Sequence, residues 1–577
     1  MKVSKVFTQP SYQNKQGYSG FPMDNLLNMT SLPGYLYPVY WDILDPGDKV
    51  SCETLLRTQM QPLTSPAMCT MCERIEWFAV PIQQLYKPFS AKYYGINDVE
   101  SDLLPTTFSS DGLPFMDLTN VNQYLGGLVT SLSLQQAYTP GAPTLGEATR
   151  LLECLGVSRF VGDTTIPSTS TFNTSVGAIP FAAYQKIYYD HYRLTDYEVN
   201  DPEAYNLDSF YNNPSISTSA RLNKLLQLRK RPYQLDYFTS AHPSPLFGSQ
   251  SVNATGVDLG VVQQWLTGLS GLNTAIPYTN TSFPSGGSVQ ASNSLPTTVK
   301  VPSSTVSNAS SNSWLAGFNP ANIRSLFAVE KLLEVTRRAK KHYDMQTLAH
   351  FGVDVPKGLS GECFKLGTHE QYIRVGEILS TADTATASLG VKVGNGHSSG
   401  QSKKIYFEAK CHCVLMAIYS VEPIMNYINE GTDRLLTSLT SCSSLFKPEF
   451  DDLGEQPAFK FELFQEVTVQ GGTSTNNSVL GWQKRYQQNK AKKNRSITGC
   501  SSTFFQEWAL NRHSFSANTF NLAFFQVWPT DINNILLQPY SGIEGASDMY
   551  SMDCFINQFY FDVIKSSKKS VFGVPNL

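Results

Sequence analysis

Strand-like runs separated by turn residues recur along this chain, and they constrain its fold more than any other feature. The run KKIYFEAKCHCVLMAIYSVEP (403–423) shows the clearest alternation of apolar and polar side chains. One face carries Phe407, Ala409, Cys411 and Cys413, and the opposite face carries Glu408, Lys410 and His412. A two-residue repeat of this kind predicts a half-buried strand, which Pro423 would end.

Five further runs have the same character: GYLYPVYWDIL (34–44), ERIEWFAVPI (73–82), FKFELFQEVTV (459–469), NTFNLAFFQVW (518–528) and CFINQFYFDVI (554–564). They are rich in Phe, Tyr, Trp and Val, and Pro and Gly lie between them. This pattern favours an antiparallel sandwich or barrel over a fold of alternating strands and helices. We therefore expect a mainly β protein.

Few segments have the period of a helix. The best is NPANIRSLFAVEKLLEVTRRAKKHYD (319–344), in which Asn319 can cap the N-terminus and Pro320 suits the first helical position. Its apolar stripe consists of Ile323, Leu326, Phe327, Val329 and Leu333. Its C-terminal end is basic, which suits the negative end of the helix dipole. Weaker candidates are 182–194 and 220–228.

Charge almost disappears after the run RKRPYQLDYFTSAHPSPLFG (229–248). From Ser249 to Ile323 the chain contains one acid, Asp258, and one base, Lys300. A linker of this length would be unusual in a compact protein, and long loops are more often functional. We interpret the segment as an ordered excursion that projects from one β domain. A shorter polar run covers 380–402.

Composition excludes several classes of protein. Hydrophobic residues make up 41% and charged residues 16%, so the chain should fold instead of forming a disordered solvating polymer. The net charge of −3 argues against a surface that neutralises nucleic acid everywhere, but it leaves room for a local basic patch. The first 25 residues lack the apolar core of a signal peptide, and no run is apolar enough to span a membrane. The ten cysteines are expected to be reduced.

The catalytic motifs HExxH and GxxxxGK[ST] are both missing from the sequence, and we expect no enzymatic activity. Two patterns, CTMC (69–72) and CHC (411–413), have the spacing of metal ligands. A structural zinc site needs two such pairs directed at one point, and His412 would lie on the opposite strand face from its two cysteines. An acidic cluster of Glu449, Asp451, Asp452 and Glu455 could hold a divalent cation or form a solvated turn. No cofactor is expected.

Three basic runs are the candidate nucleic-acid contacts. They comprise Arg229, Lys230 and Arg231; Lys484, Arg485, Lys490, Lys492, Lys493 and Arg495; and Lys565, Lys568 and Lys569. Aromatic residues accompany the first two runs, and single-stranded nucleic acid offers both phosphates for cations and base faces for aromatic rings. The alternative is that the runs are exposed loops or subunit contacts.

Several segments together resemble a known family. GYLYPVYWDILDPGDKV (34–50), IPFAAYQKIYYDHYR (179–193) and the DYFTSA stretch within 229–248 are similar to the major capsid protein of microvirus-type, gokushovirus-like single-stranded DNA bacteriophages. NIRSLFAVEKLLEVTRRAKKHYDMQTLAHFGV (322–353), GWQKRYQQNKAKKNRSITG (481–499) and the closing FYFDVIKSSKKSVFGVPNL (559–577) follow in the family's order. The resemblance covers nearly the whole chain from Gly34 onward.

The resemblance implies an eight-stranded antiparallel jelly roll, a viral capsid β-sandwich with long loop insertions and a few helices. Sixty copies would close a T=1 shell around circular single-stranded DNA, together with a small basic DNA-binding protein and other virion proteins. The basic runs would then be inner-face contacts. The protein would be located in the virion and assemble in the cytoplasm of the host bacterium, whose receptor is unknown.

The resemblance also implies three parts: residues 1–247 and 323–577 form the shell domain, and 248–322 form a surface protrusion for contact with the host. Candidate protrusion residues are Asp258, Trp265, Tyr278, Phe283 and Lys300. The low charge of this insertion and the Lys-rich run 490–495 depart from better-known members of the family. The alternative from a different class is a bacterial surface adhesin or carbohydrate-binding β-sandwich, which would require export.

Overall fold

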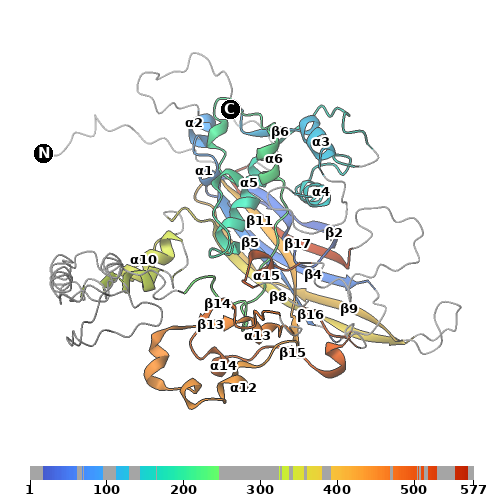
Figure 1. The fold of residues 1–577 in the computed structure, drawn as a ribbon. Coiled ribbons are helices and arrows are strands. Elements are labelled where there is room, and N and C mark those ends of the chain that lie inside the picture. Colours follow the sequence, from blue (N-terminus) through green and yellow to red (C-terminus); the bar gives the residue numbers. More distant parts are fainter. Residues whose placement is uncertain are drawn as a thin grey trace, which may run out of the picture. The chain divides into compact units, whose positions relative to one another are not determined.

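A computed structural model describes most of the chain outside the low-charge excursion (Figure 1). The described residues are 17–61, 68, 70–94, 112–128, 143–163, 166–245, 324, 328–329, 331–336, 339, 342–356, 360–379, 392–467, 472–502, 505, 508–512, 518–528 and 553–569. The chain divides into two compact units, Ser244–Val353 and the remainder. The named helix of the smaller unit is α10 (Tyr343–Phe351), which ends at Gly352 in the left-handed conformation.

The larger unit is built on one antiparallel sheet of ten strands. These are β1 (Ser19–Pro22), β2 (Asn25–Ser31), β3 (Tyr37–Leu44), β4 (Lys49–Met60), β5 (Thr70–Pro81), β8 (Phe364–Leu379), β9 (Lys392–Gln401), β10 (Ile405–Glu408), β11 (Cys413–Pro423) and β17 (Phe555–Ser567). The order runs β1-β17-β4-β9-β8-β5-β11-β3, with β2 also paired to β17 and β10 also paired to β4. The predicted mainly β, antiparallel fold is confirmed. Ten strands replace the expected eight because β1 and β2 share one edge of β17, and β9 and β10 share one edge of β4.

The sheet curls so that its two halves face each other across one core. Phe561 of β17 lies 5.2 Å from Tyr40 of β3 and 5.9 Å from Trp77 of β5, measured between ring centroids. Alternate residues of β4 and β17 are buried, because one face of these strands meets the core and the other does not. By contrast, β11 is buried along its whole length.

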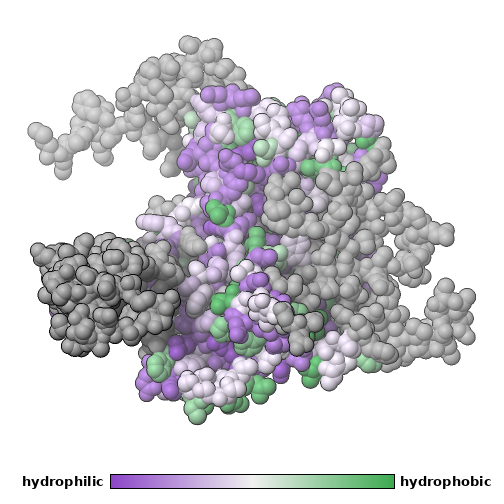
Figure 2. Space-filling model, viewed as in Figure 1, coloured by the Kyte–Doolittle hydropathy of each residue, from purple (hydrophilic) through white to green (hydrophobic). Residues whose placement is uncertain are grey.

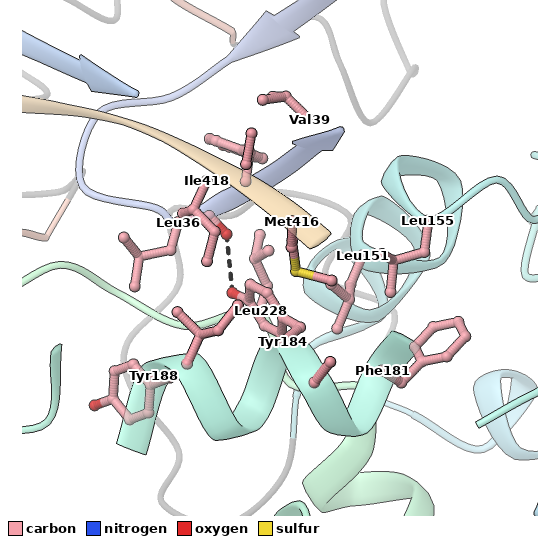
Figure 3. Packing of buried hydrophobic residues seen from close by; sticks show 14 of the residues in the cluster. Leu36, Val39, Leu151, Leu155, Phe181, Tyr184, Tyr188, Leu228, Met416 and Ile418 are labelled. Atoms are coloured by element: carbon pink, nitrogen blue, oxygen red, sulfur yellow. Dashed lines mark hydrogen bonds between the residues drawn. The ribbon is translucent and has the colours of Figure 1, made fainter. Parts of the chain in front are cut away.

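Helices cover the second face of β5 and β11. The helix α5 (Ile179–Ile187), which continues as a π-helical turn (Tyr188–Tyr192), packs on both strands. Figure 3 shows Tyr184 of α5 pointing toward β11, and its hydroxyl donates a hydrogen bond of 2.8 Å to the carbonyl oxygen of Leu36. Leu151 and Leu155, from and just after α4 (Leu145–Cys154), pack beside Met416 in the same cluster.

Shorter elements surround the sheet. On the side of α5 lie α1 (Ile82–Leu85), α2 (Phe89–Tyr94), α3 (Leu118–Gly126), α6 (Ser219–Leu225), the 3-10 turns Pro202–Ala204 and Asp208–Phe210, and the pair β6 (Phe115–Asp117) and β7 (Ser175–Gly177). The described residues between 425 and 512 form a small subdomain, drawn at the bottom of Figure 1. It contains β12 (Asn426–Ile428), α12 (Arg434–Ser438), β13 (Glu455–Phe459), α13 (Lys460–Leu463), β14 (Val479–Lys484), α14 (Gln487–Lys490), β15 (Arg495–Ser496), β16 (Asn511–Arg512) and the 3-10 turns Cys442–Ser444, Pro448–Leu453 and Thr498–Ser501.

A second core cluster joins the small subdomain to two distant segments. Phe238 and Tyr237 pack with Tyr427 of β12, and α15 (Leu522–Phe525) adds Phe524. The aromatic residues of the DYFTSA stretch therefore anchor the chain inside the larger unit.

Several local predictions are confirmed and others are wrong. The runs 34–44, 73–82 and 554–564 are strands β3, β5 and β17. The run 403–423 is two strands, β10 and β11, because residues 409–412 turn between β4 and β5; β11 is fully buried instead of half-buried. The runs 459–469 and 518–528 are not the predicted strands, because they contain the short helices α13 and α15, whose aromatic side chains pack into clusters. Predicted helices 182–194 and 220–228 correspond to α5 with its π-turn and to α6.

The predicted protrusion lies outside the described residues, and so do its candidate residues Asp258, Trp265, Tyr278, Phe283 and Lys300. The predicted helix 319–344 is described only in part, and residues 331–336 are helical. No helix in the described ranges is both long and apolar enough to cross a membrane.

Gly34 occupies a position that other residues cannot adopt easily. Its φ is +85°, and a Cβ atom there would lie 2.6 Å from the carbonyl oxygen of Val527. We expect Gly34→Ala to lower the free energy of unfolding by more than the ~1–2 kcal/mol that left-handed backbone alone costs. Gly156→Ala is the control, because Gly156 has a φ of +94° with no atom within 4 Å of its added Cβ. Equal losses in chemical denaturation would show that the contact with Val527 is unimportant.

Candidate nucleic-acid interface

The first basic run lies inside the larger unit. Residues Arg229, Lys230 and Arg231 are 7%, 9% and 9% exposed. Their backbone runs beside Gly34 and Leu36: the Leu36 amide donates to the Arg229 carbonyl at 2.9 Å, and the Arg231 amide donates to the Gly34 carbonyl at 2.7 Å. The segment therefore links the start of β3 to the rest of the core.

Each of these three cations has a partner within the chain. Arg229 donates to Gln185 Oε1 at 2.7 Å and lies 3.7 Å from Glu198. The Nζ of Lys230 lies 3.2 Å from Glu147 and 3.9 Å from the ring centroid of Trp528. Arg229, Lys230 and Arg231, predicted as contacts with DNA or with a neighbouring subunit, are therefore buried and paired inside the larger unit, where they do not present their charges to solvent.

Arg231 belongs to a buried charge network on β5 and β11. It lies 2.8 Å from Glu76 and 3.5 Å from Glu422. Glu76 also pairs with Lys365 at 2.6 Å, and Glu422 pairs with Arg74 at 2.6 Å. Burial alone would raise the pKa of Glu76, but the charges of Arg231 and Lys365 outweigh burial and lower this pKa to about 2. The first basic run therefore stabilises the fold electrostatically.

Acid should weaken this network. A carboxylate whose folded pKa lies near 2, below its ordinary value of 4.5, stabilises the fold above pH 4.5 and loses that contribution as the pH falls toward 2. The contribution is about 3 kcal/mol. We expect the difference in unfolding free energy between the native protein and Glu76→Gln to shrink across this range, as measured by denaturant unfolding at each pH. Glu370→Gln, at an exposed partner of Arg74, should give a nearly constant difference. Parallel curves for the native protein and Glu76→Gln would contradict the prediction.

The C-terminal basic run is divided between β17, which contains Lys565, and the residues that follow this strand. Lys565 is 5% exposed, and its Nζ lies 2.9 Å from Asp42 and donates to the carbonyl oxygen of Ile43 at 2.6 Å. Lys565, predicted as a contact with DNA, is therefore also buried and paired within the chain. Lys568 and Lys569 are exposed, and Lys569 pairs with Asp45 at 2.9 Å.

The remaining basic run follows β14 through α14 to β15 in the small subdomain. Four of its cations are exposed, and we call them the basic surface: Lys484, Lys490, Lys492 and Arg495. Lys490 lies 2.6 Å from Asp451, and Arg495 lies 3.8 Å from Asp433, both in exposed or half-exposed pairs. Such pairs are weak and can be exchanged for phosphate contacts.

Two other residues of this run are less available. Lys493 is half-buried and donates to the backbone carbonyl of Glu462 at 2.7 Å, and burial lowers its pKa. Arg485 is half-buried between the rings of Phe450 and Tyr486, at 5.6 and 5.4 Å from their centroids. The structure thus separates a solvent-facing part of the run from a part that supports the subdomain.

The cysteine patterns predicted from their spacing are described only in part. The Sγ atoms of Cys411 and Cys413 are 3.5 Å apart, whereas the His412 ring packs against Phe89 and Tyr93. Cys69 lies outside the described residues. Within the described ranges, no group of three or more His, Cys, Asp or Glu side chains is arranged to hold a metal ion.

Sequence reasoning missed a buried ion pair that joins distant parts of the larger unit. Arg150 of α4 donates to Asp553, just before β17, through Nη1 at 3.0 Å and Nη2 at 2.6 Å. Arg150 sits in an amphipathic helix where a basic residue ordinarily faces solvent, so no local pattern distinguishes it. Sequence reasoning also missed two polar residues of the small subdomain: Arg434, which pairs with Glu462 at 2.9 Å, and Gln456, which donates to Gln488 Oε1 at 2.7 Å.

Comparison with known proteins gives consistent matches. The family model described as "Capsid protein (F protein)" matches residues 157–577. Capsid protein VP1 of Chlamydia phage 1 is 22% identical over 626 aligned residues, covering 98% of this chain and 95% of that protein. Capsid protein VP1 of Bdellovibrio phage phiMH2K is 22% identical, covering 94% of this chain and 92% of that protein. The similarity extends over almost the full length of both relatives.

Proposed function

Because this chain belongs to the phage capsid protein (F protein) family, which implies a structural role in a virion, we propose that sixty copies assemble into a T=1 icosahedral shell around circular single-stranded DNA. The similarity to two phage capsid proteins over more than nine-tenths of the chain carries this proposal. A small basic DNA-binding protein and other virion proteins complete the particle, which assembles in the cytoplasm of the host bacterium.

An exposed apolar stripe on the sheet supports self-association. On the solvent face of β17, Tyr560 pairs across strands with Leu26 of β2 and Leu55 of β4. These three side chains are 41%, 57% and 40% exposed, and Ile556 and Ile564 extend the stripe along β17. A contiguous exposed apolar patch on a folded protein commonly marks a contact with another molecule. We assign this stripe to a contact between subunits.

The low-charge insertion 248–322 forms the surface protrusion in this proposal and makes the contact with the host. Its support is its position directly after the anchored DYFTSA stretch and its lack of charge. Electron microscopy of the purified protein or its parent particles tests the assembly. Closed shells containing sixty subunits are the expected result, and a persistent monomer that binds glycans would overturn it.

Genome contact depends on the basic surface in this proposal. We expect joint replacement of Lys484, Lys490, Lys492 and Arg495 by Gln to lower affinity for single-stranded DNA, because each cation that meets a phosphate releases a counterion. The slope of log affinity against log salt concentration should flatten by up to about 3, at about 0.7 per phosphate contact. A fluorescence binding assay with an oligodeoxynucleotide at several salt concentrations measures this slope.

The matched control changes four exposed lysines outside the small subdomain: Lys87, Lys403, Lys404 and Lys410. Both variants change the net charge by the same amount, so the control separates local contact from the overall field of the protein. If both variants flatten the slope equally, the basic surface is not the DNA contact.

A further inference from the structure

A polar and aromatic pocket of about 370 Å³ lies in the small subdomain. Its walls come from α12, from β13 with the start of α13, and from the turn between β14 and α14. In Figure 2, hydrophobic and hydrophilic residues lie side by side over this lower part of the molecule, where Figure 1 places α12 and α14. The volume falls within the range of small-molecule sites.

Aromatic rings supply flat surfaces to this pocket. Phe459 and Phe461 stack with their ring centroids 5.6 Å apart and their planes inclined by 16°. Both are only half-buried, so they lie at the surface of the pocket instead of deep in the core. Tyr486 lines the pocket at a φ of +57°, and its amide donates to Gln456 Oε1 at 2.9 Å. A non-glycine residue in this conformation is strained, and strained residues often hold a functional geometry.

Hydrogen-bonding groups surround these rings. Gln456 donates to Gln488 Oε1 at 2.7 Å, and Thr437 and Ser443 also line the pocket. The Nε of Arg485, another lining residue, is buried without a hydrogen-bond partner in the described part of the chain. An unsatisfied buried donor costs free energy, which a bound acceptor would recover.

Charge within the pocket is nearly balanced. Arg434 pairs with Glu462 at 2.9 Å, and Glu455 lines the pocket along with Arg485. A free phosphate would therefore find little net attraction inside, whereas a neutral planar group with hydrogen-bonding edges fits the rings and the amides. Two cations of the basic surface lie near the pocket in sequence, since Lys484 and Lys490 flank the lining segment Arg485–Gln488.

We propose that this pocket binds a nucleobase of single-stranded DNA, with the strand's phosphates on the flanking lysines. The inference rests on the proposed function and specifies one of its DNA contacts. Stacking of a base on an aromatic side chain is sequence-tolerant, which suits a surface that meets an entire genome. A neutral sugar could use the same rings and amides, but it would have no need for the adjacent cations.

The test measures binding of the full chain to two fluorescent strands of equal length, a thymidine oligodeoxynucleotide and an abasic phosphodiester strand. We expect the double variant Phe459→Leu, Phe461→Leu to bind the thymidine strand roughly tenfold more weakly, a loss typical of stacking, and the abasic strand as the native chain does. Arg485→Gln should also lower the affinity for the thymidine strand and leave the affinity for the abasic strand unchanged. Phe160→Leu is the matched control, because Phe160 is an exposed ring with a neighbouring arginine, Arg159, at 5.4 Å.

Circular dichroism and denaturant unfolding confirm that each variant is folded before binding is compared. Equal affinity of the native chain and the Phe459→Leu, Phe461→Leu variant for the thymidine strand overturns the pocket proposal. The proposal is also overturned if this variant loses binding of neutral oligosaccharides and keeps its binding of the thymidine strand. In both cases the proposed function stands if closed shells with DNA still form. If the native chain binds neither strand and forms no shells, the proposed function itself fails.

Discussion

We expect Arg231→Met to lower the free energy of unfolding by about 3–5 kcal/mol at neutral pH. The substitution keeps the aliphatic volume but removes the guanidinium that lies 2.8 Å from Glu76 and 3.5 Å from Glu422. Both carboxylates are almost completely buried, so they would lose a charge partner where water cannot replace it. Denaturant unfolding followed by fluorescence and circular dichroism measures the loss.

Two further variants test whether this loss of stability comes from the buried charge network. Lys87→Met removes a cation from an exposed pair with Asp208 at 3.7 Å, and it should change stability by less than about 1 kcal/mol. The double variant Arg231→Met, Glu76→Gln should recover part of the loss, because it removes one of the two buried carboxylates that lose Arg231 as a partner. A change below 1 kcal/mol for Arg231→Met would mean that the buried network contributes little to stability.

We expect Phe561→Ala to cost about 3–5 kcal/mol, the usual range when a large aromatic residue is removed from a packed core. Phe561 is fully buried, stacks on Phe559 at 5.9 Å, and contacts Tyr40 and Trp77 from the opposite half of the sheet. Its loss would leave a cavity where the two halves of the curled sheet meet. Thermal and chemical unfolding of the unassembled subunit provide the measurement.

The adjacent residue supplies the control for this substitution. Tyr560 lies on the same strand but faces solvent, so Tyr560→Ala should leave the stability of the isolated subunit within about 1 kcal/mol of the native value. It should weaken assembly instead, since Tyr560 belongs to the exposed apolar stripe. Equal destabilisation by the two substitutions would show that strand propensity, and not burial against the opposite half, sets the cost at Phe561.

Strand prediction succeeded where the local pattern and the tertiary environment agree. The run 554–564 alternates because β17 meets the core on one face only, and the run 73–82 is buried throughout because β5 is covered on both faces. Prediction failed at 459–469 and 518–528, although these runs contain many aromatic residues. Their rings pack among themselves and against Tyr427 and the DYFTSA stretch, and this packing, made with residues far away in sequence, decides their conformation.

The basic runs illustrate the same limit for the candidate site. Arg229–Arg231 and Lys490–Arg495 look alike in sequence, yet the first is buried among carboxylates and most of the second is exposed. The difference depends on Glu76, Glu147 and Glu422, which lie far away along the chain. A Lys or Arg in the sequence predicts a positive charge, but only the fold determines its ion-pair partner.

The amino-acid sequence by itself determined the mainly β class, the approximate positions of β3, β5 and β17, and the family, because strand period and motif order are local properties of the chain. Only the tertiary structure decided which cations face solvent, where the two halves of the sheet meet, and that Phe459, Phe461 and Tyr486 line one pocket. Those features arise from contacts between residues far apart in sequence, and burial is a property of such contacts and not of any single segment.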